Sequence, residues 1–115
     1  MCIRDRDAVS SPKMTTFEFD ISSTHPLVTL VTMVAPSPDW FVGVSGLALY
    51  EQGTWTATVT IPLYPWDAGT DSGISFTSPD QETLPRQPIS RITGAPLGSG
   101  GTVGPLGSFT ITKIQ

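Results

Sequence analysis

The sequence predicts an all-β domain, an antiparallel β-sandwich, from three observations. Charged residues make up only 14% of the 115-residue chain, and Gly and Pro contribute 11 residues each. No segment has the apolar periodicity of a long amphipathic helix. Short segments with strand patterns are separated by turn-forming residues, as is typical of sandwiches. The length indicates one domain, and an apolar fraction of 38% is too high for a fully disordered chain.

Two segments in the first half of the chain carry strand patterns. In residues 16–21 every second side chain is apolar, which predicts a half-buried strand: Phe17, Phe19 and Ile21. Residues 27–35 (LVTLVTMVA) form a nearly continuous apolar run rich in Val and Thr, which predicts a central strand. The proline-containing segment 36–38 ends this strand, because proline has no N–H for a sheet ladder.

The clearest strand pattern lies in residues 54–63 (TWTATVTIPL). One face is predicted to lie in the core and the other in solvent, because the apolar and polar side chains alternate strictly. Trp55 belongs to the apolar face, so we expect it in the core. Residues 64–85 are rich in turn formers, with a short strand expected at 74–77. A second short strand is expected at 88–93, a loop at 94–107, and a final strand at 108–114.

The first residues are set apart from the fold. The codons for Met1–Asp5 match the mosaic end of a transposase-type sequencing adaptor, so residues 1–6 are interpreted as an artefact. Cys2 is the single cysteine of the chain, so no disulfide is expected. Residues 7–15 are predicted to be a linker or disordered lead-in, and residues 16–115 the domain. We therefore expect the native N-terminus, with any signal peptide and N-terminal strands, to be missing.

Charge and hydropathy argue against a nucleic-acid partner and against a transmembrane segment. The net charge is -4 and the six basic residues are scattered, whereas nucleic-acid binding requires clustered Lys and Arg to contact phosphates. No run of 18 apolar residues occurs, so no transmembrane segment is predicted.

Three aspartates in turn segments are candidate calcium ligands. Asp39 lies in PSPDWFVG, and Asp67 and Asp71 lie in YPWDAGTDSG. Loops of a sandwich gather at its two ends, so distant turns can meet there. Calcium binds six to eight oxygens, several of them from carboxylates. The alternative is that each aspartate only stabilises its own turn by accepting a backbone hydrogen bond.

The patterns that would indicate an enzyme are weak. Asp71-Ser72-Gly73 matches the D-[ST]-G triplet of aspartic proteases, but the triplet does not follow an apolar strand, and such a protease needs a carboxylate from each of two subunits. Asp67 and Asp71 as an acid/base pair for glycoside cleavage would need a large cleft. His25, the single histidine, is expected at the surface, and no nucleophile motif accompanies it. We therefore expect no catalysis.

Two tryptophans adjoin the aspartates. Trp40 follows Asp39 and Trp66 precedes Asp67. Exposed aromatic side chains mark binding interfaces, so these two residues either form a binding surface or cover the end of the core.

The strings PSPDWFVGVSGLAL and LYPWDAGTDSGISFTSPDQ resemble the spondin domain, which occurs near the N-terminus of F-spondin and mindin and in secreted bacterial proteins. The similarity extends from about Thr16 to Ile114 and includes TSPDQETLP and PISRIT. Animal members have a cysteine about where this chain has Tyr50. This departure indicates a bacterial-type member.

The resemblance implies a β-sandwich related to C2 domains that holds a divalent cation, calcium. The family's ligands map onto Asp39, Asp67 and Asp71. The resemblance also implies a secreted, extracellular module for adhesion, here with an unidentified extracellular protein or glycan as ligand. The alternatives are a structural sandwich without metal and an aspartic-protease-like enzyme that uses Asp71.

Overall fold

The computed structural model describes residues 7–115, which form strands and loops without a helix. The interpretation of residues 1–6 as an artefact lies outside the described residues. Within residues 7–115 there is no helical segment that could span a membrane. The strands are β1 (Leu27–Met33), β2 (Trp40–Ala48), β3 (Tyr50–Glu51), β4 (Thr54–Trp55), β5 (Thr58–Leu63), β6 (Pro65–Asp67), β7 (Ser90–Arg91) and β8 (Gly107–Thr112).

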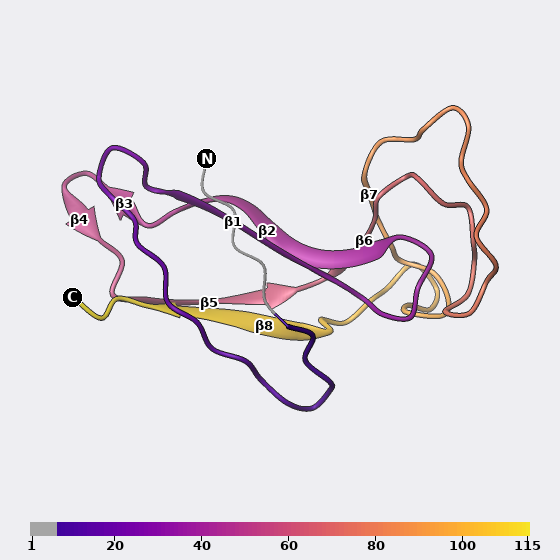
Figure 1. Cartoon of the computed structure of the whole chain (residues 1–115), viewed down its shortest axis with the longest axis horizontal. Coiled ribbons are helices and arrows are strands. Elements are labelled where there is room, and N and C mark those ends of the chain that lie inside the picture. The colour runs from indigo at the N-terminus through magenta and orange to yellow at the C-terminus, as the bar shows by residue number, and fades with distance from the viewer. Residues whose placement is uncertain (1–6) are drawn as a thin grey trace.

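The strands form two layers, and every pairing between strands is antiparallel. One layer is a four-stranded sheet with the order β1-β2-β6-β7, and the other is the pair β5-β8. Figure 1 shows β1, β2 and β6 above β5 and β8, with the β3–β4 hairpin at one end of the layers and the long β6–β7 connection at the other. This arrangement confirms the predicted all-β, sandwich-like fold.

The strongest sequence patterns are found as strands. The apolar run at 27–35 forms β1, although β1 is the edge of its sheet and not the predicted central strand. Residues 54–63 form β4 and β5. The predicted division into two faces is present in β5, where Leu63 is buried and Thr58 and Thr60 are exposed. The C-terminal strand begins at Gly107, one residue before the predicted start.

Other segments depart from the predictions. Residues 16–21 alternate in burial as expected but form no strand. Residues 74–77 contain a bend and a turn in place of the expected strand, and only Ser90–Arg91 of the segment 88–93 is a strand. Strand β2 was not predicted, because two glycines and a serine interrupt its apolar pattern and glycine weakens an isolated strand. Pairing with β1 on one side and β6 on the other stabilises β2 in spite of this.

The core lies between the two layers. Its most buried side chains come from β1, β2, the segment after β2, β5 and β6: Val28, Trp40, Val42, Leu49, Leu63 and Pro65. Because β2 alternates, Trp40 and Val42 point into the core while Phe41 points away from it. The burial of Trp40 therefore positions the residue before it, Asp39, at the end of the sheet.

The β6–β7 connection, residues 68–89, depends on a glycine. Gly69 is buried and has φ +77°, a conformation that favours glycine. A Cβ atom on Gly69 would collide with the carbonyl oxygen of Gln87. The N–H of Gln87 donates to the carbonyl of Gly69 at 2.9 Å, so the two ends of the connection meet at this residue.

We expect Gly69→Ala to destabilise the fold far more than Gly46→Ala. Both glycines have positive φ, but a Cβ on Gly46 meets no atom within 4 Å. The left-handed conformation costs an alanine about 1–2 kcal/mol. The collision at Gly69 adds about 1–3 kcal/mol to the loss in unfolding free energy, since the packed backbone must move. Urea unfolding measures both losses, and equal losses would contradict the steric role of Gly69.

Candidate metal site

Asp39 joins the start of β2 to the β6–β7 connection. Its Oδ2 accepts hydrogen bonds from the N–H of Thr70 at 2.7 Å, the hydroxyl of Thr70 at 3.0 Å and the N–H of Asp71 at 3.0 Å. Its backbone carbonyl accepts a further hydrogen bond from the N–H of Ala68 at 3.3 Å. One carboxylate oxygen thus holds a loop that lies 31 to 32 residues away in the sequence.

The other carboxylate oxygen of Asp39 has no partner. Oδ1 is buried and makes no hydrogen bond with the described residues. Burying a charged oxygen without a partner is costly, and a cation next to Oδ1 would offset this cost. This orphaned oxygen is the feature of the structure that fits a metal ion best.

Asp67 and Asp71 each form a turn with a following glycine. Oδ1 of Asp67 accepts the N–H of Gly69 at 2.6 Å, and Oδ1 of Asp71 accepts the N–H of Gly73 at 2.8 Å. Oδ2 of Asp71 also accepts the N–H of Gln81 at 3.2 Å. Both aspartates of the repeated D-x-G pattern therefore stabilise their own turns, which was the alternative to calcium binding. Oδ2 of Asp67 makes no hydrogen bond within residues 7–115.

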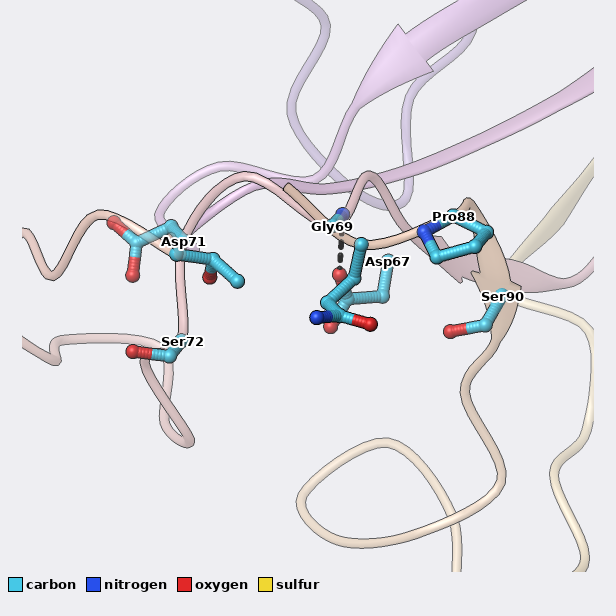
Figure 2. A pocket seen from close by; sticks show the side chains of 8 residues that line it. Asp67, Gly69, Asp71, Ser72, Pro88 and Ser90 are labelled. Atoms are coloured by element: carbon cyan, nitrogen blue, oxygen red, sulfur yellow. Dashed lines mark hydrogen bonds between the residues drawn. The ribbon is translucent and has the colours of Figure 1, made fainter. Parts of the chain in front are cut away.

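Asp67 and Asp71 line the same open cavity of about 440 Å³. Figure 2 shows Asp67 on the cavity wall and the carboxylate of Asp71 turned away from it. In the described part of the chain, no three Asp, Glu, His or Cys side chains are grouped so that they could hold a metal ion together. The structure thus brings Asp39 into contact with the backbone of Asp71. Asp67 and Asp71 lie along the same cavity. The three carboxylates, however, do not converge on one point.

The donor chemistry of this region fits a hard cation. Carboxylate and carbonyl oxygens are the ligands that calcium prefers, and Oδ1 of Asp39 and Oδ2 of Asp67 are not used by backbone N–H groups. Sequence analysis missed Thr70 and Gln81, which hold the carboxylates of Asp39 and Asp71. Neither residue has a local pattern that signals a contact with a distant turn.

The two tryptophans have different roles. Trp40 is 4% exposed and packs edge-on against Phe76 with ring centroids 5.5 Å apart. It is therefore a core residue, and the prediction that it belongs to a binding surface does not agree with its burial. Trp66 is half-buried, and the guanidinium carbon of Arg91 lies 5.3 Å from its ring centroid.

The residues that suggested catalysis are in structural positions. Both carboxylate oxygens of Asp71 accept backbone N–H groups of its own loop, so the Asp71-Ser72-Gly73 triplet serves to shape that loop. His25 is exposed, and its Nδ1 lies 3.2 Å from the hydroxyl of Thr24, as expected for a surface histidine.

The sequence matches the spondin N-terminal family (Spondin_N) over residues 2–98. The chain belongs to this family. Spondin-2 of Rattus norvegicus is 44% identical over 86 residues, which cover 75% of this chain and 26% of that protein. Spondin-2 of Homo sapiens is 42% identical with the same coverage. Spondin-1 of Xenopus laevis is 35% identical over 105 residues, which cover 84% of this chain and 13% of that protein.

The chain spans about a quarter or less of the length of these relatives. The relatives are animal proteins, so they do not support the expectation of a bacterial-type spondin domain. The expectation that N-terminal strands are missing stays a prediction.

We expect Asp39→Ala to destabilise this spondin domain even in the presence of a chelator. The substitution removes the acceptor for three hydrogen bonds. One hydrogen bond to a charged group contributes roughly 1.5–3 kcal/mol. Because the three bonds share a single oxygen, we expect the free energy of unfolding to fall by about 1–3 kcal/mol in total. Urea unfolding in chelator measures it. Asp80→Ala removes an exposed carboxylate and is the matched control. A similar small effect of both substitutions would show that Asp39 does not anchor the loop.

Proposed function

We propose that this chain is a secreted, calcium-binding β-sandwich module that mediates extracellular adhesion by binding a protein or glycan on a surface or in the matrix, without catalysis. Membership of the spondin family supports the class of module. The observation that carries the calcium proposal is the buried Oδ1 of Asp39, which lacks a hydrogen-bond partner within the described residues.

In this proposal calcium would be held by Asp39, Asp67 and Asp71, and the carboxylate of Asp71 would turn toward the ion from the backbone N–H groups that it now accepts. The bound ion would supply positive charge between the loop before β2 and the β6–β7 connection. Extracellular calcium modules bind the ion with dissociation constants of roughly 0.1–1 mM. At ten times the dissociation constant, such an ion adds about 1.4 kcal/mol to the free energy of unfolding. The ion would therefore make the loops more rigid under extracellular conditions.

Thermal melts of the full chain with and without calcium test this proposal. Calcium at about 5 mM, well above the expected dissociation constant, is compared with the same concentration of chelator. We expect calcium to raise the melting temperature by roughly 5–10 °C, as follows from about 1.4 kcal/mol in a domain of this size. The rise should be absent in the double variant Asp67→Asn/Asp71→Asn.

Glu51→Gln, which removes one exposed carboxylate from the β3–β4 hairpin at the other end of the layers, is the matched control and should keep the full response to calcium. An unchanged melting temperature of the wild type in calcium, with cooperative unfolding in both conditions, would contradict the metal site.

A purely structural role of the aspartates is the second candidate. The turns that Asp67 and Asp71 form with Gly69 and Gly73 favour it. Asparagine also forms such turns, so under this candidate the double variant would match the wild type with calcium and with chelator. A difference between the two proteins that appears only with calcium would exclude it.

A further inference from the structure

The face of the four-stranded sheet that points away from β5 and β8 carries a continuous row of side chains. Side chains alternate along a strand, so the neighbours of the buried residues of β2 and β6 lie on this outer face. The register pairs Met33 with Phe41, Phe41 with Trp66, and Trp66 with Arg91. These four residues, one from each strand of the sheet, are named the outer row.

The outer row is exposed at its two ends and half-buried in the middle. Met33 is 70% exposed, and Val31 beside it in β1 is 64% exposed. Phe41 and Trp66 are half-buried, and Arg91 is exposed. Contiguous apolar surface exposed on a folded domain is characteristic of interaction sites, which makes this row a candidate for one. The row is apolar at the β1 end, aromatic in the middle and cationic at the β7 end.

Arg91 is held by aromatic rings but has no anionic partner. Its guanidinium carbon lies 4.3 Å from the ring centroid of Tyr64 and 5.3 Å from that of Trp66. Stacking on aromatic rings uses the flat face of the guanidinium and leaves its N–H groups free to donate in the plane. In residues 7–115 the ion pair found is between Arg86 and Glu82, at 2.6 Å, and none involves Arg91.

We propose that the outer row is a docking surface for a protein partner that places a carboxylate on Arg91 and apolar side chains on Trp66, Phe41 and Met33. The charge complementarity is local, because a guanidinium fixed by two rings is ready to bind a carboxylate through two hydrogen bonds. The inference rests on the adhesion role proposed above, but it is independent of the calcium site, because this surface contains none of the three aspartates.

A protein partner fits this surface better than a glycan. Aromatic residues, Met and Arg are enriched in protein–protein interfaces, and Trp, Tyr and Arg dominate their binding energy. The β1 end of the row, formed by Val31 and Met33, has no hydrogen-bonding side chain for sugar hydroxyls. It suits the apolar side chains of a second protein.

The spacing of the row defines a peptide probe. Four neighbouring strands span about 14 Å, because adjacent strands lie about 4.8 Å apart. An extended peptide advances about 3.3 Å per residue, so the first, third and fifth side chains on one face span about 13 Å. The peptide acetyl-Glu-Ser-Leu-Ser-Leu-amide, laid across the strands, therefore matches an acid on Arg91 followed by two apolar contacts.

The test is an NMR titration of the full chain with this peptide, in chelator so that failure of the calcium site does not affect the result. We expect the indole N–H signal of Trp66 and the Nε–H signal of Arg91 to shift. The peptide with Gln in place of Glu should bind at least about tenfold more weakly, since it lacks the charge. Arg91→Gln should weaken binding of the Glu peptide by a similar factor, and the matched control Arg86→Gln should not.

A second variant tests the apolar end of the row. Met33→Glu should weaken binding of the acidic peptide by at least about tenfold, because it replaces an apolar contact by a like charge. Ile114→Glu introduces the same charge at another exposed apolar position, outside the sheet, and should leave binding unchanged.

Four outcomes would overturn the proposal. The first is the absence of shifts at millimolar peptide, and the second is equal affinity for the Glu and Gln peptides. The third is tighter binding of a glucuronate-containing oligosaccharide, which would assign the face to an acidic glycan. The fourth is self-association of the free protein that Arg91→Gln abolishes, which would assign the face to a second copy of this chain.

Discussion

The contact between the carboxylate of Asp39 and the backbone of residues 70 and 71 is the interaction on which the candidate metal site depends. It joins the loop before β2 to the β6–β7 connection. The turn hydrogen bonds of Asp67 and Asp71 and the close approach at Gly69 give that connection its path. The connection leads into β7, which is only two residues long. Because so short a strand has few pairing contacts of its own, the pairing of Arg91 with Trp66 also depends on where the connection ends.

Strand β2 contributes to both proposed sites, with side chains on its two opposite faces. Its inward side chains, Trp40 and Val42, are part of the core, and the burial of Trp40 sets the position of Asp39 and of the candidate calcium site at the end of the sheet. Its outward side chain Phe41 lies in the middle of the outer row, between Met33 and Trp66. The alternation of one strand thus places the candidate cation site and the proposed docking surface on different parts of the same sheet.

Sequence periodicity predicted the elements whose patterns are complete within one segment. Residues 54–63 alternate strictly, and β5 has the expected buried and exposed faces. Residues 16–21 alternate as well, but periodicity within one segment does not specify a pairing strand, and this segment belongs to none of the sheets formed within residues 7–115. Strand β2 shows the opposite case, since two neighbouring strands stabilise a segment in which Gly43 and Gly46 interrupt the pattern.

The sequence by itself determined the β-class of the fold, the positions of β1, β5 and β8 and the presence of aspartates in tight turns, because each of these follows from local residue order. Tertiary structure decided that Trp40 is buried while Trp66 is accessible, that Asp39 holds a loop more than 30 residues away, and that Arg91 lies over Tyr64 and Trp66. These arrangements depend on the register between strands that are distant in the sequence. Local periodicity assigns a side chain to one face of its own strand, but the packing of the whole sheet decides which side chain from another strand lies beside it.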